Sequence, residues 1–298
     1  MKILILGSHG FIGSVIYSAL SSDNDVYGCD IQKSDEKRYF CISAENPDFS
    51  IVFKQEEFDV CINASGIANV SLSMKNPIAD FDANARNVFC ILDCIRQYQS
   101  HCSFITLSSA AVYGNPERLP IKEVDKLKPV SPYGFDKMIS ENICRLFSEI
   151  YGVKTSCLRL FSVYGEGQKK MLLWDVCCKF RDDSIVSLFG TGNESRDYIH
   201  VTEIPRIISL IIERQKENFS VYNIANGKQI KVRYVAELIK QYMKSDKEIV
   251  FSNDVRKGDP LNWEADISKI KAFGYEPDIS IEDGINKYVD WFKSIRQF

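Results

Sequence analysis

Residues 2–13 read Lys2-Ile-Leu-Ile-Leu6 followed by Gly7-Ser-His-Gly10-Phe-Ile-Gly13. The apolar run is typical of a buried strand, and apolar residues over 12–20 recur at helical spacing, so the stretch predicts strand, glycine turn and helix. In this order the first glycine permits a tight turn, the second lets the backbone approach a pyrophosphate, and the third lets the helix pack on the strand. The stretch therefore predicts the first unit of a doubly wound parallel α/β sheet, with a phosphate at the start of the helix.

A second strand, predicted over 25–29, ends in Asp30. A carboxylate at this place accepts hydrogen bonds from the hydroxyls of an adenosine ribose, and its charge would repel the 2′-phosphate of NADP, so Asp30 predicts NAD. Lys33 and Lys37 follow closely and keep a 2′-phosphate open as an alternative. Without a ligand, Asp30 would be a solvent-exposed carboxylate at a strand end.

The rest of the chain alternates between strand and helix patterns up to about residue 161 and less regularly beyond it. Periodicity and turn residues predict further strands over 58–62, 103–107, 153–158, 185–189, 221–224 and 248–251, and helices over 78–98, 132–150, 171–181, 202–214, 233–243 and 281–294. The pattern predicts two interleaved lobes. The dinucleotide-binding lobe is expected to span 1–161 with a return at about 196–225, and a smaller substrate-binding lobe is expected to span 162–195 and 226–298.

The helix predicted from residue 132 carries a phenol and an ammonium one turn apart. Ser131 is a good N-cap and Pro132 suits the first helical position, so Tyr133 and Lys137 share one face. A tyrosine has a pKa near 10, so a phenolate base needs cationic neighbours such as Lys137, while Ser109 would hold the reacting oxygen. The three side chains predict proton removal from a sugar or alcohol hydroxyl while hydride leaves for NAD. Because Tyr-x-x-x-Lys is frequent by chance, a surface aromatic beside a solvated lysine is the alternative.

Taken together, these motifs resemble an extended short-chain dehydrogenase/reductase, and within that group the NAD-dependent sugar-nucleotide epimerase/dehydratase family typified by UDP-galactose 4-epimerase. The resemblance covers nearly the whole chain and implies a Rossmann sheet with a smaller C-terminal lobe. Its further matches are Ser108-Ser-Ala-Ala-Val-Tyr-Gly114, Arg159-Leu-Phe161, Val163-Tyr-Gly165, Arg196-Asp-Tyr-Ile-His200, Tyr222-Asn-Ile224, Arg256-Lys-Gly-Asp259 and Ala265-Asp-Ile-Ser-Lys269.

The resemblance also implies which residues form the site. Ser109, Tyr133 and Lys137 would be catalytic, with Tyr133 as the base and Lys137 as a ribose anchor. The cofactor contacts that it implies are Gly7, Gly10, Phe11, Ile12, Gly13, Asp30, Ile31, Ala64, Ser65, Gly66, Asn84, Tyr133, Lys137 and Phe161. The substrate contacts that it implies are Ser108, Ser109, Ser162, Arg196, Arg256 and Asp259.

Two arginines are expected to hold a nucleoside-diphosphate sugar. Arg196 and Arg256 would clamp its diphosphate, since guanidinium groups give charge-assisted, bidentate bonds to phosphate oxygens. Ordinary surface ion pairs with Asp197 and Asp259 are the alternative for these arginines. The residues 64–66 likewise have an alternative, namely an ordinary turn after a strand.

Residues that depart from the family pattern favour some reactions of the family over others. Ser162 stands where the family usually has an asparagine near the substrate phosphates, and an acidic residue that the family often places against adenine is lacking around 40–42. Ala110 and Ala111 occupy the place of the Asp-Glu pair of the 4,6-dehydratases, so elimination is disfavoured. The first hypothesis is a 4-epimerase, and the second is a 4-keto-sugar reductase or a sugar-nucleotide dehydrogenase. A non-catalytic dinucleotide-binding protein is the third.

Composition excludes several classes of partner. Lys and Arg number 37 against 40 Asp and Glu, so no general attraction to nucleic acid or an anionic membrane is expected. Ten cysteines without a Cys-x-x-Cys pair indicate buried reduced thiols rather than a metal site. With no signal-peptide pattern and no membrane-spanning apolar run, a cytoplasmic protein is expected. From the resemblance, a homodimer is expected to form through the helices predicted over 78–98 and 132–150.

Overall fold

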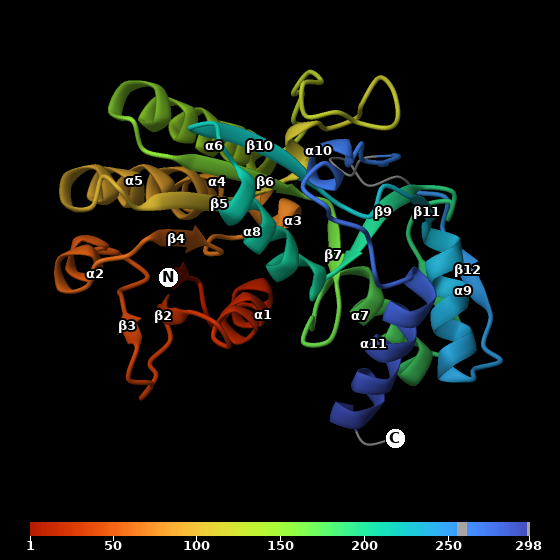
Figure 1. Cartoon of the computed structure of the whole chain (residues 1–298). Helices are drawn as coiled ribbons and strands as arrows, with labels where there is room; N and C mark the ends of the chain where they lie inside the picture. The colour runs from red at the N-terminus through yellow and green to blue at the C-terminus, as the bar shows by residue number, and fades with distance from the viewer. Residues whose placement is uncertain (255–260, 297–298) are drawn as a thin grey trace.

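The computed structural model describes residues 1–254 and 261–296, and its centre is a seven-stranded parallel sheet (Figure 1). The strands are β1 (Lys2–Leu6), β2 (Asp25–Asp30), β3 (Tyr39–Cys41), β4 (Val60–Asn63), β5 (Ser103–Ser109), β6 (Thr155–Leu160) and β10 (Phe219–Ile224). Their order is β10-β6-β5-β4-β1-β2-β3, and all neighbours run parallel. The predicted doubly wound α/β sheet is confirmed.

Helices cover both faces of this sheet. They are α1 (Phe11–Leu20), α2 (Ser50–Gln55), α3 (Val70–Lys75), α4 (Pro77–Phe81), the π-helical segment η1 (Asp82–Arg86), α5 (Asn87–Tyr98), the 3-10 turn η2 (Ala110–Val112), α6 (Pro132–Tyr151) and α8 (Glu203–Arg214). Side chains of β1 alternate between two apolar cores, with Ile3 and Ile5 on the side of α1 and α8, and Leu4 and Leu6 on the side of α2, α5 and α6. Because both faces are covered, β1 is apolar without a break from Ile3 to Leu6.

Most of the remaining elements pack around a third apolar core on the side of α9 (Val232–Met243) and α11 (Ile281–Arg296) (Figure 1). The others around it are β7 (Ser162–Tyr164), α7 (Met171–Asp182), β8 (Val186–Leu188), β9 (Ser195–His200), β11 (Gln229–Lys231) and β12 (Ile249–Phe251). Helix α10 (Ser268–Lys271) packs instead against β10. The strands form a three-stranded sheet, β11-β9-β7, and a two-stranded sheet, β12-β8. Helix α8 and strand β10 return to the central sheet, whereas β9 pairs with β7 and β11. The lobe boundaries themselves stay a prediction.

Helix α6 begins and ends where the sequence indicates. The Ser131 hydroxyl accepts a hydrogen bond of 3.2 Å from the N–H of Gly134, and Pro132 occupies the first turn. The helix ends at Gly152, whose φ of 72° is the left-handed conformation that favours glycine. These local signals fix where Tyr133 and Lys137 lie along the chain.

The helix predicted over 78–98 is not continuous. The chain instead forms α4, the π-helical segment η1 and α5. A π-helical turn is wider than an α-helical one and disrupts simple 3.6-residue spacing, so periodicity could not locate it. Asn84 lies in this segment and is buried. Strand β5 also runs two residues past its predicted end, to Ser109, and β3, α2 and α3 were too short for a periodic signal.

Candidate functional site

The site residues lie at the carboxyl edge of the central sheet, where the strand order reverses. Strands β2 and β3 lie on one side of β1, and β4, β5 and β6 lie on the other. The loops after β1 and β4 touch at this point, because a Cβ placed on Gly7 would lie only 2.7 Å from the backbone nitrogen of Ser65. Ligands of doubly wound sheets bind in the crevice at such a reversal.

The glycine turn after β1 forms a cradle of backbone. Gly7 has a φ of +78°, and a Cβ at Gly13 would collide with the carbonyl oxygen of Gly7, so both positions need glycine. Gly10 is the N-cap of α1, and no side chain caps this helix, which leaves backbone N–H groups of its first turn for an anion. The Ser8 hydroxyl in the same turn is buried without a hydrogen-bond partner among the described residues. The cradle fits the pyrophosphate of a dinucleotide.

The side chain of Asp30 is hydrogen-bonded to the backbone of this cradle. Its carboxylate accepts hydrogen bonds from the backbone N–H of His9 at 2.9 Å, of Ile31 at 2.8 Å and of Gln32 at 3.4 Å. A carboxylate has about four acceptor positions, so capacity remains for a ribose hydroxyl. Asp30 is therefore not a free strand-end carboxylate, and its contact with a ribose stays a prediction. The His9 ring stacks on Tyr39 with centroids 4.9 Å apart.

The loop after β4 approaches the π-helical segment. Gly66 has a φ of +115°, and a Cβ there would lie 2.6 Å from the side-chain oxygen of Asn84. The Asn84 amide donates to the carbonyl of Ile67 at 3.0 Å, and the Ser65 hydroxyl donates to the side chain of Asn63 at 2.6 Å. These contacts fix the loop beside the cradle, which an ordinary surface turn would not require.

Tyr133 lies inside this edge and next to Ser109. Ser109 ends β5, and its hydroxyl accepts the N–H of Ala111 at 3.1 Å. Burial raises the pKa of Tyr133, a hydrogen bond with Ser109 acts in the opposite direction, and the charge of Asp80 raises it further. The Tyr133 phenol is therefore neutral at pH 7, and the surface-aromatic alternative is wrong.

Lys137 is the cation beside Tyr133. Its ammonium donates to the carbonyl of Leu107 at 2.9 Å and lies 5.9 Å from the centroid of the Tyr133 ring. Burial lowers the pKa of Lys137 to about 8, although the charges of Asp80 and Glu141 act to raise it. A buried acid and a buried base whose pKa values are shifted in opposite directions, side by side at a sheet edge, are typical of a catalytic site.

A buried polar network lies under these residues. Glu141 accepts hydrogen bonds from Ser108 at 2.6 Å and, through both oxygens, from Arg159 at 2.9 and 2.7 Å. Arg159 also donates to the Tyr113 hydroxyl at 2.7 Å, and Tyr113 donates to Asn223 at 2.6 Å. The Ser108 hydroxyl donates within this internal network, and its predicted contact with the substrate stays a prediction.

The structure describes some of the residues that were predicted to contact the substrate. Arg196 lies on β9, where it donates to the carbonyl of Ser195 at 2.8 Å and lies 5.6 Å from the Trp263 ring. Asp197 is fully buried and accepts backbone N–H groups, including those of Asn226 and Ala265, so it is not the surface ion-pair partner considered for Arg196. The other predicted substrate residues Arg256 and Asp259 lie outside the described residues.

Phe161 and Ser162 connect the two lobes. Phe161 is buried between Tyr113 and Trp263, with ring centroids 6.3 and 5.8 Å away. Ser162 opens β7 and pairs in register with Tyr198. The contacts predicted for them with cofactor and substrate stay predictions, as do those of Phe11, Ile12 and Ile31 at the cradle.

Sequence reasoning missed the buried polar face of α6. Side chains at helical spacing, Tyr133, Asp136, Lys137, Ser140 and Glu141, are all buried, whereas the apolar positions of the helix are in part exposed. The spacing i, i+3, i+4 of polar residues after the Tyr-x-x-x-Lys pair was the available signal. Helix α6 therefore turns a polar face inward.

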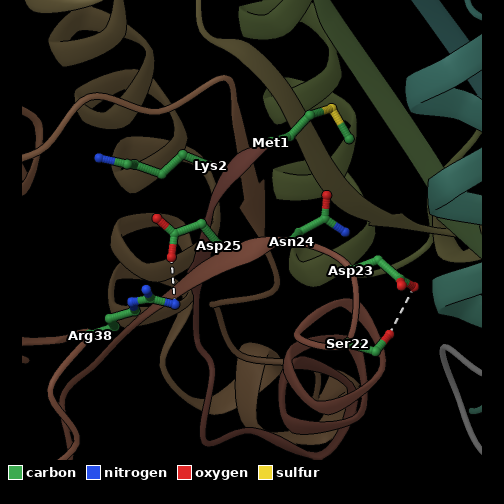
Figure 2. Close-up of a pocket in the computed structure, with 7 residues that line it drawn as sticks. All are labelled: Met1, Lys2, Ser22, Asp23, Asn24, Asp25 and Arg38. Carbon is green, nitrogen blue, oxygen red and sulfur yellow. Dashed lines mark hydrogen bonds and ion pairs between the residues drawn. The ribbon is translucent and has the colours of Figure 1, made fainter.

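The depression drawn in Figure 2 lies at the opposite edge of the sheet, where β1 and β2 begin. Its charged groups already have partners: Arg38 pairs with Asp25 at 2.5 Å, and Lys2 pairs with Glu56 outside the depression. It has no connection to the cradle, and we assign it no function. Within residues 1–254 and 261–296, no cluster of metal-binding side chains and no helix long and apolar enough to cross a membrane occurs.

Comparisons with known proteins point to one family. The chain matches the model of the "NAD dependent epimerase/dehydratase family" over residues 3–225. It is 30% identical to the "Putative UDP-glucose 4-epimerase" of Methanocaldococcus jannaschii over 98% of both chains. It is similar to UDP-N-acetylglucosamine 4-epimerase from Methanobrevibacter ruminantium M1, in complex with UDP-N-acetylmuramic acid, at a TM-score of 0.90 and 26% identity over 99% of this chain and 98% of that one. It is similar to UDP-glucuronic acid 4-epimerase from Bacillus cereus, in complex with UDP-glucuronic acid and NAD, at a TM-score of 0.90 and 25% identity over 99% and 100%.

Proposed function

The chain belongs to the NAD-dependent epimerase/dehydratase family, and on that premise we propose that it is a 4-epimerase of a nucleoside-diphosphate sugar. NAD is the cofactor. The observation that supports the reaction most is the gathering of Ser109, Tyr133 and Lys137 at the sheet edge beside the glycine cradle. The names of the relatives favour UDP as the nucleotide.

Tyr133 is the proposed acid and base. In its deprotonated form it would take the proton of the sugar 4-hydroxyl and later return it to the same oxygen. The ammonium of Lys137 favours this phenolate over the neutral phenol that burial favours in the structure without NAD. NAD, held by the glycine cradle, would supply the hydride acceptor and donor for the same carbon. Ser109, in hydrogen-bond contact with Tyr133, aligns the sugar oxygen. Return of the hydride to the other face of the sugar gives the epimer.

The other chemistry of the family, elimination, has less support. A 4,6-dehydratase must move a second proton, and the alanines after Ser109 carry no acid or base. Ala110 is also fully buried. A 4-keto-sugar reductase or a sugar-nucleotide dehydrogenase would use the same three catalytic residues and is the second candidate, which differs in exchanging its cofactor at each turnover.

A panel of sugar nucleotides tests the proposal. We would incubate the purified protein with UDP-, dTDP-, CDP- and GDP-sugars without added cofactor and follow epimer formation by NMR. Epimer at a catalytic protein concentration is expected. Conversion that consumes NAD(P)(H) in stoichiometric amounts would establish the reductase or dehydrogenase instead, and no conversion of any sugar by NAD-loaded protein would contradict the proposal.

Asp30 is expected to control NAD affinity. The Asp30→Asn variant removes the charge that we propose faces the ribose hydroxyls, and a charge-assisted hydrogen bond contributes about 1.5–3 kcal/mol. The dissociation constant for NAD should therefore rise about tenfold or more, measured by calorimetric titration. Asp35→Asn, which changes an exposed carboxylate five residues later, is the matched control. Equal affinities of both variants and the native protein would show that Asp30 serves the loop alone.

We propose that two copies of the chain pair through α5 and α6. Large apolar side chains are exposed on this part of the surface although the polar face of α6 is buried. They are Ile78 on α4, Phe81 at its end, Phe89 on α5, and Phe135, Leu146 and Ile150 on α6, with Ile78 75% and Ile150 65% exposed. An exposed apolar patch on a helix pair is typical of a protein interface.

Two aspartates introduced into this apolar patch should separate the dimer into single chains. The Leu146→Asp/Ile150→Asp variant places two charges where we expect a dry interface, so its mass by light scattering at micromolar concentration should fall to that of one chain of 34.0 kDa. Val124→Asp, at an 88% exposed position outside these helices, should leave the mass unchanged. A native protein that is already monomeric would contradict the proposed dimer.

A further inference from the structure

Two aspartates lie inside the fold beside Lys137. Asp80 on α4 is 2% exposed, and Asp136 on α6 is 6% exposed. The two helices pack together, and both oxygens of Asp80 and Oδ2 of Asp136 are buried with no donor among the described residues. The two carboxyl groups lie within hydrogen-bonding reach of each other. A hydrogen bond between two carboxyl groups requires a proton on one of them, because carboxylates only accept.

The charges around the pair favour one shared proton. Lys137 is the only cation among the described residues that acts on the two aspartates, and the amide of Asn84 on η1 is a neutral neighbour. On α6, Glu141 is neutralised by Arg159 of β6, and on α3, which packs against both helices, Ser73 is buried and Lys75 is exposed. The thiols of Cys144 and Cys157 are fully buried. Two carboxylates against one ammonium would leave an uncompensated buried charge, which one proton removes.

We propose that Asp80 and Asp136 share one proton and act together as the counter-charge of Lys137, which makes them positioning residues of the active site. The pair then carries one negative charge and Lys137 one positive charge, so the buried cluster is neutral. Its importance for catalysis rests on the proposed function, whereas its protonation does not.

The titration of the two groups agrees with this assignment. Burial, a hydrogen bond with Asp80 and the charge of Asp80 raise the pKa of Asp136 from 3.8 to about 7, and burial also raises the pKa of Asp80. The charge of Asp80 in turn raises the pKa of both Lys137 and Tyr133. When one carboxyl group is removed, the other can ionise and keep a negative charge in the pair, whereas removing both should lower the pKa of Lys137 and of Tyr133.

Infrared spectroscopy tests the shared proton without any turnover. At pH 6 the spectrum of the native protein minus that of Asp136→Asn should show the C=O stretch of a protonated carboxyl group. Asp197, whose pKa burial raises to about 7, is present in both proteins and cancels in this difference. In Asp80→Asn the band should titrate at a lower pH than in the native protein, because the neighbouring charge is gone. No protonated-carboxyl band in this difference spectrum, or the same titration in Asp80→Asn, overturns the proposal.

The stability of Asp136→Asn gives a second readout. Since the folded protein binds this proton more tightly than the unfolded chain, the stabilisation is complete below the unfolded pKa of 3.8 and is lost as the pH rises through about 7. Asparagine keeps a neutral hydrogen-bonding group at every pH. The Tm of the variant minus that of the native protein should therefore increase between pH 4 and 7, by about 3 °C or more. Asp82→Asn is the control, because Asp82 lies two residues after Asp80 and its side chain is half exposed. If the Tm difference between Asp136→Asn and the native protein changes no more with pH than that of the control, the shared proton is overturned.

The pH profile of epimerisation tests the positioning role. Both limbs of the kcat profile should move to lower pH in the double variant Asp80→Asn/Asp136→Asn, which removes the counter-charge of Lys137. Each single variant keeps one ionised carboxyl group in the pair, so its limbs should stay near the native ones. A structural role alone would reduce kcat without moving the limbs, and that result overturns the positioning role. Absence of epimerase activity in the native protein would instead count against the proposed function and leave the infrared and Tm results to decide the shared proton.

Discussion

The Tyr133→Phe variant is expected to lower kcat at least about 10²-fold and up to about 10⁴-fold, the range of general acid–base catalysis. Phenylalanine fills the same buried space beside Lys137 and removes only the hydroxyl that contacts Ser109. NAD affinity should change little in comparison, because the cradle is made of backbone from a different loop. Epimer formation and calorimetric NAD binding, measured on the same preparation, check both parts.

Tyr151→Phe is the matched control, since Tyr151 lies on the same helix with its ring exposed. It should keep native kcat. If Tyr133→Phe retained full activity while NAD binding persisted, Tyr133 would not be the base. A protein that binds NAD and turns over no sugar nucleotide with either tyrosine present would favour the non-catalytic dinucleotide-binding hypothesis.

Glu141→Gln is expected to lower the free energy of unfolding by about 3–5 kcal/mol, because it leaves the buried charge of Arg159 without its partner. The native pair is bidentate, at 2.9 and 2.7 Å, and both side chains are only 5% exposed. The loss should appear as a lower midpoint of urea unfolding with the slope unchanged. Activity should fall as well, since Ser108 bonds Glu141 and is the neighbour of Ser109.

Asp93→Asn gives the comparison for an exposed pair. Asp93 bonds Arg96 at 2.9 and 2.7 Å on the surface of α5, and its removal should change stability by less than about 1 kcal/mol. If both variants lost the same small free energy of unfolding, water or another group would compensate the charge of Arg159. The buried network around Glu141 would then add little to the stability of the fold.

Much of the site follows from local sequence signals. The turn at Gly7, the cap at Ser131 and the end of the helix at Gly152 each depend on a backbone requirement that one residue type meets, so they could be placed from the chain alone. Parallel strands share one carboxyl edge, and this rule predicted that Ser109 would lie at the ligand-binding edge, where the structure places it beside Tyr133.

Other parts depend on contacts that spacing does not encode. The apolar positions of α6 follow helical spacing, yet Leu146 and Ile150 are exposed, because the polar side of the helix packs against α4 and the sheet. Asp80 lies 56 positions before Asp136, and only tertiary packing brings the two carboxyl groups together. The bond from Asp30 to His9 likewise joins two loops that the sequence describes separately.

Asp30 has a consequence for engineering the cofactor preference. Its carboxylate fixes the backbone of His9 inside the glycine turn and, in the proposed enzyme, also selects against a 2′-phosphate. A small neutral residue introduced to admit NADP would remove the acceptor that orders the turn. Redesign at this position therefore has to supply a new acceptor for the His9 N–H. Without one, a variant that admits the 2′-phosphate would also lose the hydrogen bond that orders the glycine turn.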